Sequence, residues 1–271
     1  MTYVALITGA SSGIGEATAR RLAREPDVKL ILIARRAEKL KALAAELGGP
    51  DRARMLALDL TSDDAPARVK EFVEAHGDRL HLLVNNAGAA WRGSFGDSGW
   101  ANLERHMRLN FQAPARLTEA LLPLLRATAA AGESISGRRV AIVNVASTAG
   151  RVARPRSGAY SASKFALVGW TDALHLEELE HGVHVGLVLP GFVQTEGFPA
   201  TELLAKALTR PIVSQPETVA AAIMEAGPGG RAERYTPRYY WLGAALRLLA
   251  PSLTRRATAG GAFTTATKVH D

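Results

Sequence analysis

The stretch YVALITGASSGIG, residues 3–15, decides the fold. Its first part, Tyr3–Ile7, is apolar without alternation, which is typical of a strand buried on both faces. Its second part, Thr8–Gly15, has glycines at G-x-x-x-G-x-G spacing and precedes a segment of helical period. Such a turn leaves free N–H groups at the helix N-terminus, where phosphates bind. A glycine cluster alone is only a loop, but its position between strand and helix favours a dinucleotide site.

Similar apolar runs recur along the chain and are separated by segments of helical period. The runs are Tyr3–Ile7, Val28–Ile33, Met55–Leu58, His81–Val84, Val140–Val145 and Val183–Leu189. A seventh short strand is expected at Arg234–Thr236. Between the runs, two sets of leucines each share one helix face: 40, 43 and 47, and 117, 121 and 125. This alternation predicts parallel strands joined by right-handed crossovers. We therefore expect one α/β domain, a Rossmann-like doubly wound parallel sheet of about seven strands with helices on both faces.

Two regions depart from this alternation. Residues 192–216 contain only a short helical stretch around Leu203–Leu208, and we expect them to form a substrate lid over the carboxyl ends of the strands. Residues 237–271 are expected to form a C-terminal helical appendage that ends in a flexible Gly/Ala/Thr-rich tail. The catalytic domain would then span residues 1–236, including the lid, with the appendage belonging to the same domain.

Composition excludes several classes of function. Of 271 residues, 47% are hydrophobic and 22% charged, which fits a globular domain, and the absence of Cys excludes disulfides and thiolate chemistry. Most of the net charge, +5 of +7, lies in residues 227–271 beside bulky apolar residues, so we expect no nucleic-acid binding. The seven His show no metal-ligand spacing, and no metal is predicted. Because we find neither an export signal nor a spanning apolar stretch, we expect a cytoplasmic protein.

The end of the second expected strand bears on the choice between NAD and NADP. There KLILI is followed by Ala34, Arg35 and Arg36. NAD-selective folds usually carry an acid at this position for the ribose 2′-hydroxyl, whereas guanidiniums suit a 2′-phosphate. NADP (NADPH) is therefore favoured over NAD, the alternative being that both arginines merely face water. Asp59, after the third strand, is expected either near the adenine amino group or as a cap of the next helix.

A second group of polar residues follows the fourth and fifth strands. Tyr160 and Lys164 lie one helical turn apart, and Ser147 precedes Tyr160 by thirteen residues. A phenol, with an ordinary pKa near 10, needs a nearby cation to act as an acid or base at neutral pH. A neighbouring ammonium supplies that charge. A Tyr-x-x-x-Lys pattern alone would be an ordinary helix face, so the argument depends on the other motifs found with it.

Those motifs occur together in one order. They are Thr8–Gly15, Asn85–Gly88, Asn110, Ser147, Tyr160, Lys164 and the segment PGFVQT at 190–195. In this order and spacing the chain resembles the short-chain dehydrogenase/reductase family in its compact form. The resemblance covers residues 2 to about 195 closely and the remainder in outline.

The resemblance implies an NADP(H)-dependent oxidoreductase that interconverts a carbonyl and a secondary alcohol. Tyr160 would be the acid/base, and Lys164 would lower its pKa and contact the nicotinamide ribose. Ser147 would bond the substrate oxygen, and Asn110, in the helix that begins ERHMRLNFQAP, would hold a water of the proton relay. The alternative is a non-catalytic dinucleotide-binding regulator, which has little need for these four residues together.

The binding residues expected from the motifs and the resemblance form two sets. For the cofactor they are Gly9, Ser11, Ser12, Gly13, Ile14, Gly15, Arg35, Arg36, Asp59, Leu60, Asn86, Ala87, Gly88, Tyr160, Lys164, Pro190, Gly191, Val193 and Thr195. For the substrate they are Ser147, Tyr160, Trp91, Val152, Phe192 and Phe198, which predict a moderately large apolar ketone or alcohol. Arg92, Arg151 and Arg154 could meet an anionic group, although arginines on loops are usually solvated.

Two features concern partners. The segment Tyr239–Ala250, followed by Arg255 and Arg256, could contact a membrane surface, complete the lid or form a subunit interface. A segment of about 12 apolar-rich residues is more often buried against protein, so the last two interpretations are favoured. The expected helix Ala159–Leu179 is apolar on opposite faces, and we expect a homodimer or homotetramer, as in the family.

Overall fold

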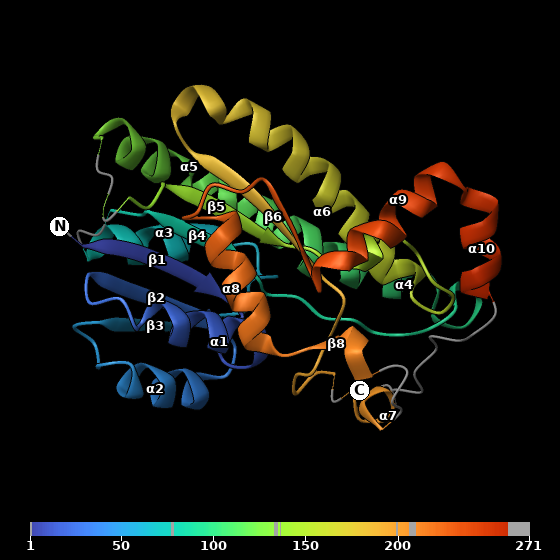
Figure 1. Cartoon of the computed structure of the whole chain (residues 1–271). Helices are drawn as coiled ribbons and strands as arrows, with labels where there is room; N and C mark the ends of the chain where they lie inside the picture. The colour runs from blue at the N-terminus through green and yellow to red at the C-terminus, as the bar shows by residue number, and fades with distance from the viewer. Residues whose placement is uncertain are drawn as a thin grey trace.

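The computed structural model describes residues 2–76, 79–132, 135, 137–198, 200–205 and 210–259. Seven parallel strands form one sheet in the order β3-β2-β1-β4-β5-β6-β9 (Figure 1). They are β1 (Tyr3–Thr8), β2 (Val28–Ala34), β3 (Ala53–Ala57), β4 (Leu82–Asn85), β5 (Ala141–Val145), β6 (His184–Pro190) and β9 (Glu233–Thr236). The predicted doubly wound sheet is confirmed, with strand ends shifted by one or two residues.

Helices cover both faces of the sheet. On one face lie α1 (Gly13–Leu22), α2 (Ala37–Glu46) and α8 (Pro216–Ala226); on the other lie α3 (Ala65–Ala75), α5 (Ala113–Ala130) and α6 (Gly158–Glu177), and α4 (Phe95–Met107) packs on α6. Along β1, Ala5 and Ile7 pack with the first layer, whereas Val4 and Leu6 pack with the second. Burial of both faces explains why the strands are apolar at almost every position.

The order of the strands reverses between β1 and β4, and one hydroxyl joins the two strand ends there. Thr8 Oγ1 accepts hydrogen bonds from the backbone N–H groups of Asn86 (2.9 Å) and Ala87 (3.0 Å) and donates to the Val84 carbonyl (3.1 Å). The Asn86 side-chain amide donates in return to the Thr8 carbonyl at 2.9 Å. Doubly wound folds bind ligands at such a reversal, outside the carboxyl ends of the strands.

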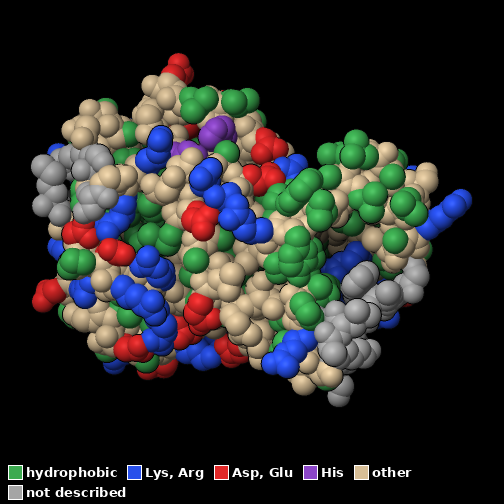
Figure 2. Space-filling view, in the orientation of Figure 1, with side chains coloured by type: hydrophobic (Ala, Val, Ile, Leu, Met, Phe, Trp, Pro, Cys, Tyr) green, Lys and Arg blue, Asp and Glu red, His purple; other side chains and the backbone are tan. Residues whose placement is uncertain are grey.

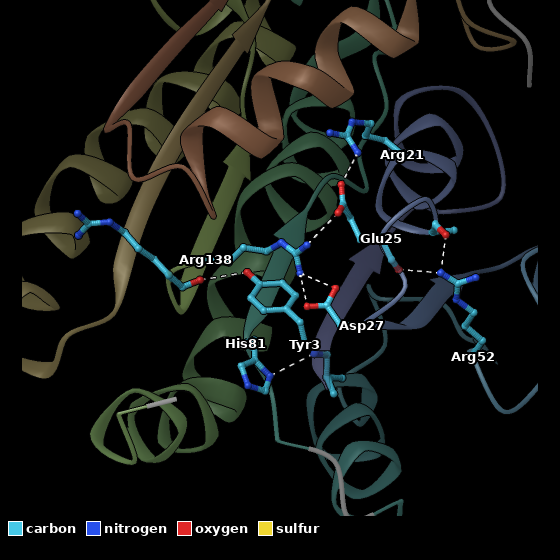
Figure 3. Close-up of polar contacts among 10 residues, drawn as sticks. Tyr3, Arg21, Glu25, Asp27, Arg52, His81 and Arg138 are labelled. Atoms are coloured by element: carbon cyan, nitrogen blue, oxygen red, sulfur yellow. Dashed lines mark hydrogen bonds and ion pairs between the residues drawn. The ribbon is translucent and has the colours of Figure 1, made fainter. Parts of the chain in front are cut away.

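At the other end of the strands, their amino ends, a polar cluster surrounds Arg138 (Figure 3). Its guanidinium bonds Asp27 and Glu25, both at 3.0 Å, and lies over the Tyr3 ring at 5.4 Å. The Tyr3 hydroxyl donates to the Arg139 carbonyl at 3.0 Å. These contacts join the amino ends of strands that are distant in sequence. The loops that form the site lie at the carboxyl ends of the strands.

The expected lid contains little regular structure. Phe192–Val193 (β7) pairs in parallel with Val213–Ser214 (β8), and Thr201–Leu204 forms the short helix α7. The rest of the predicted stretch Leu203–Leu208 is Ala205, in a turn, and positions 206–208, which lie outside the described residues. The hydroxyls of Tyr239 and Tyr240 donate to the carbonyls of Pro211 (2.9 Å) and Ile212 (3.0 Å), so the start of the C-terminal segment contacts the lid.

The C-terminal segment forms α9 (Trp241–Leu249) and α10 (Pro251–Ala259), which project beside the lid (Figure 1). Hydrophobic side chains gather on this lobe in Figure 2; those that are exposed are Tyr239, Trp241, Leu242, Leu246, Leu248, Leu249 and Leu253. The tail expected to be flexible lies mainly outside the described residues, from residue 260 on. No helix within the described ranges is long and apolar enough to cross a bilayer.

Replacing Thr8 with Val should destabilise the fold, because the hydroxyl that joins β1 to the loop after β4 is lost. We expect the free energy of unfolding to fall by about 1–3 kcal/mol in chemical denaturation, the cost of unpaired buried polar groups. Thr8→Ser keeps the hydroxyl and should lose clearly less. Equal stability of the two variants would contradict this account.

Candidate active site

A cleft of about 590 Å³ lies at the carboxyl ends of β1, β2, β3 and β4. Of the expected cofactor residues, it is lined by Gly9, Ser11, Ser12, Gly13, Ile14, Arg35, Arg36, Asp59, Leu60, Asn86, Ala87, Gly88 and Thr195. An adjoining cavity of about 270 Å³ is lined by Tyr160, Lys164, Pro190, Gly191 and Val193, together with Ser147. The two share Ile14, Asn86, Gly88 and Thr195, so the expected cofactor and catalytic residues meet along one continuous surface.

The glycine turn has the geometry that a bound pyrophosphate needs. Gly9 and Gly13 have φ of +67° and +56°, in the left-handed region that favours glycine. A Cβ at Gly15 would lie 2.3 Å from the Gly9 carbonyl oxygen, so only glycine fits beneath the turn. The N-cap residue of α1, Ser12, makes no side-chain cap hydrogen bond, which leaves the first N–H groups of the helix available to an anion. This chain therefore fits a dinucleotide.

Arg36 lies between the glycine turn and the lid. Its guanidinium donates to the hydroxyls of Ser12 (2.6 Å) and Ser11 (3.2 and 3.1 Å). It also pairs with Glu196 at 2.9 Å, and Lys39 Nζ pairs with the same carboxylate at 2.9 Å. These two hydrogen-bonded cations hold the pKa of Glu196 below its usual range, Lys39 contributing most. Neither Lys39 nor Glu196 was expected from the sequence, although Glu196 directly follows the Thr195 motif.

Asp59 lines the cleft but is used within its own turn. Its Oδ1 accepts hydrogen bonds from the Thr61 N–H (2.9 Å) and hydroxyl (2.8 Å), and the N–H bond is the main reason its pKa is lowered. Asp59 thus caps the turn after β3 rather than the next helix, since α3 begins only at Ala65, and its expected contact with adenine stays a prediction. Arg105 and Arg108, which the sequence analysis did not single out, also line this cleft.

Asn110 connects three elements of the site. It lies in a π-helical turn, Arg108–Gln112, between α4 and α5, which the sequence did not predict. Its side chain accepts from Ala89 N–H (3.0 Å) and donates to the Ala89 carbonyl (2.9 Å) and to Ser163 Oγ (3.1 Å). Such single π turns are frequent at functional sites because they redirect one side chain. Here the turn joins the loop after β4 to α6.

Tyr160 is half-buried among groups that act on its ionisation. Burial raises the pKa of its phenol, while a hydrogen bond with Ser147 and then the Arg154 charge act in the opposite direction. Lys164, to which the sequence analysis assigned this lowering, donates from Nζ to the Val145 carbonyl at 2.9 Å, and burial lowers its own pKa to about 8. Ser147 Oγ donates to the Pro190 carbonyl at 3.3 Å, which fixes its position at the end of β5.

The substrate side of the cavity differs from expectation at one residue. Trp91, Phe192 and Phe198 line it, and the last two rings stack with centroids 5.7 Å apart. Val152 does not line it. Its N–H bonds to the Thr148 carbonyl, which continues the short helical turn Thr148–Gly150, and the chain reaches the cavity only at Arg154.

His106 is a site residue that sequence reasoning treated as merely structural. It is fully buried, with its ring centroid 6.1 Å from that of Tyr160. Its Nε2 accepts from the Trp91 N–H (3.0 Å), while Nδ1 donates to the Asn102 carbonyl (2.6 Å). Burial lowers the pKa of His106, which keeps the ring neutral, as an accepting Nε2 requires. It therefore fixes the backbone of the loop that carries Trp91.

The histidines and acids do not converge anywhere in the described part of the chain. No group of three or more His, Cys, Asp or Glu side chains there could hold a metal ion.

Known proteins share both the sequence pattern and the fold. The family model for short chain dehydrogenase matches residues 3–202. Ketoacyl reductase HetN of Nostoc sp. is 31% identical over 82% of this chain and 74% of its own length. A short-chain dehydrogenase from Streptomyces avermitilis superposes with a TM-score of 0.76 at 30% identity, covering 97% of this chain and 99% of the other.

Two further structures were solved with a cofactor bound. The NADP complex of RhlG from Pseudomonas aeruginosa has a TM-score of 0.73 at 28% identity and covers 84% of this chain and 91% of that one. The NADH complex of 3-ketoacyl-(acyl-carrier-protein) reductase from Brucella melitensis has the same TM-score and identity, covering 84% and 92%. The chain thus belongs to the short-chain dehydrogenase/reductase family, nucleotide-binding oxidoreductases that act on CH–OH and C=O groups.

Proposed function

We propose that this protein is an NADP(H)-dependent oxidoreductase that interconverts a carbonyl and a secondary alcohol on a moderately large apolar substrate. The observation that carries the proposal is the cavity in which Ser147, Tyr160 and Lys164 adjoin the cleft of the glycine turn. The aromatic lining by Trp91, Phe192 and Phe198 supports an apolar substrate. Relatives named as ketoacyl reductases support reduction of a ketone.

The residues of this chain divide the chemistry between them. A bound nicotinamide supplies or accepts the hydride. The Ser147 and Tyr160 hydroxyls hold the substrate oxygen, and Tyr160 donates its proton to that oxygen in reduction and removes it in oxidation. Asn110 fixes the loop after β4, so that the cavity keeps its shape. Lys164 would bind the nicotinamide ribose from its place beside Val145.

Preference for NADP(H) rests on the charges around the end of β2. Arg35 and Arg36 line the cleft, and Lys39 lies one turn further along α2. Glu196 is the carboxylate that pairs with Arg36 and Lys39, and it reaches them from the lid rather than from β2. A 2′-phosphate could replace this carboxylate as the partner of both cations, because phosphate and carboxylate offer guanidinium the same forked acceptor geometry.

The first test is cofactor choice, measured by titration of nicotinamide fluorescence. The protein should bind NADPH more tightly than NADH. Arg36→Gln should weaken NADPH binding by about tenfold, the worth of one charge-assisted contact, and change NADH binding much less. Arg68→Gln removes an arginine of the exposed Asp64 pair on α3 and should change neither. Tighter binding of NADH by the unaltered protein would overturn the 2′-phosphate argument and leave the Tyr160 chemistry standing.

The second test concerns Tyr160. Tyr160→Phe should lower kcat for ketone reduction by about 10²-fold or more, because general acid catalysis is lost, while NADPH affinity stays similar. Tyr3→Phe removes a hydroxyl that bonds the Arg139 carbonyl at the opposite end of the strands, and it should retain activity. Substantial turnover by the Tyr160 variant would refute the mechanism. A protein that binds NADPH but reduces no ketone in a broad panel would instead support the regulator alternative.

The assembly and the lid belong to the same proposal. The outward face of α6 leaves Phe165 and Leu176 exposed, which supports a homodimer or homotetramer. Residues 192–216 would close over the bound substrate, since Phe192 and Phe198 line the cavity and the segment is fastened to Tyr239 and Tyr240.

A further inference from the structure

The described residues that line the cavity around Tyr160 include cations but no acid. Its lining contains Arg92, Arg154 and Lys164, and none of its lining residues in the described chain is Asp or Glu. Lys164 donates to the Val145 carbonyl, and Arg92 lies over the Phe198 ring at 5.6 Å. A concave surface on which the charged side chains are all positive favours an anionic ligand.

Two arginines of one loop have opposite environments. Arg151 pairs with Glu233 at 2.6 Å and with Asp172 at 3.7 Å, so its charge is neutralised within the protein. Arg154, three residues later, forms no ion pair with any described residue, and its guanidinium lies 4.6 Å above the Phe192 ring. The loop thus presents one neutralised arginine outside the cavity and one unneutralised arginine inside it.

Arg154 is held where a charge without a partner is costly. It lies on an aromatic ring beside Tyr160 and Tyr240, and burial lowers the pKa of its guanidinium. Taking a charge out of water disfavours the charged form unless a counter-charge and hydrogen bonds replace the lost hydration. A cation–π contact supplies part of this, but no described residue accepts a hydrogen bond from the guanidinium N–H groups of half-buried Arg154, which are therefore open to an acceptor on a ligand.

We propose that Arg154 binds a carboxylate of the substrate, so that the protein acts on oxo acids and the corresponding hydroxy acids. The guanidinium fork matches a carboxylate with two parallel hydrogen bonds. The apolar chain between carboxylate and ketone would lie on the stacked rings of Phe192 and Phe198. This inference rests on the proposed carbonyl reduction at Tyr160. It separates the protein from a reductase of carrier-bound ketoacyl groups, in which the carboxyl is esterified and uncharged.

The first experiment compares acids with their neutral esters. NADPH-dependent kcat/KM is measured for 3-oxo-, 5-oxo- and 7-oxooctanoate and for their methyl esters, which differ only in charge at the carboxyl. At least one acid should exceed its ester by about tenfold or more, as expected for a charge-assisted bidentate contact. Arg154→Gln should abolish this ratio, Arg154→Lys should keep part of it, and Arg151→Gln should leave it intact.

Two results would overturn the proposal in this experiment. One is that no acid exceeds its ester in the unaltered protein. The other is that Arg154→Gln lowers acid and ester rates equally and moves the pH profile upward, because Arg154 would then act only on the Tyr160 phenol. Thermal unfolding of each variant shows whether a loss of activity reflects a loss of folded protein.

The second experiment does not depend on turnover. Calorimetric titration of the protein, with NADP⁺ present, compares octanoate with octan-1-ol. Octanoate should bind about tenfold or more tightly than the alcohol, and Arg154→Gln should remove the difference. Equal binding of acid and alcohol by the unaltered protein refutes the carboxylate site even if ketones are reduced. Octanoate binding that depends on Arg154, without reduction of any ketone, refutes the proposed function and leaves the site standing.

Discussion

The Thr8 hydroxyl is the contact on which the geometry of the site depends. It bonds the N–H groups of Asn86 and Ala87, so the loops after β1 and β4 are fixed to each other at the reversal of strand order. The glycine turn follows Thr8 directly. In the loop after β4, Ala89, three residues after Asn86, donates its backbone N–H to the Asn110 side chain. The cofactor cleft and the cavity of Tyr160 share these two loops, so their relative position follows from one local set of hydrogen bonds.

Positive charge is concentrated at the carboxyl edge of the sheet. Arg36 and Lys39 stand at the cofactor end, and Arg154 and Lys164 at the substrate end. The positive end of the α1 dipole lies between them. The far edge is arranged differently, because Arg138 is matched there by Asp27 and Glu25 (Figure 3). The charge of Arg138 is thus neutralised within the protein. At the carboxyl ends of the strands, Arg36 and Lys39 share the single carboxylate of Glu196 and Arg154 pairs with no described acid, so this side favours anionic ligands.

The sheet could be predicted from the sequence because each of its strands is a continuous apolar run. Such a run can be recognised without knowing which strands lie beside it. The glycine turn and the Tyr160–Lys164 spacing are local in the same sense. What could not be predicted depends on contacts distant in the chain. Glu196 pairs with Arg36 although the two residues are 160 positions apart in sequence. The sequence around β2 therefore does not indicate that an acid lies beside Arg36. Arg151 and Arg154 look alike within RVARPR, and only Glu233, 82 positions away from Arg151, distinguishes them. Val152 was wrongly assigned to the pocket because the turn before it cannot be recognised from composition.

The same arginine links substrate charge to the proton on Tyr160. Burial raises the pKa of this phenol and keeps it protonated, whereas the Ser147 hydrogen bond and the Arg154 charge lower that pKa. A substrate carboxylate on Arg154 would neutralise that charge, so the phenol pKa would rise on binding and the proton would stay on Tyr160 until the substrate oxygen takes it. A neutral substrate would leave the lowering charge in place. Carboxylate binding therefore disfavours the oxidative direction, in which Tyr160 must begin as phenolate, more than the reductive one, in which it begins protonated.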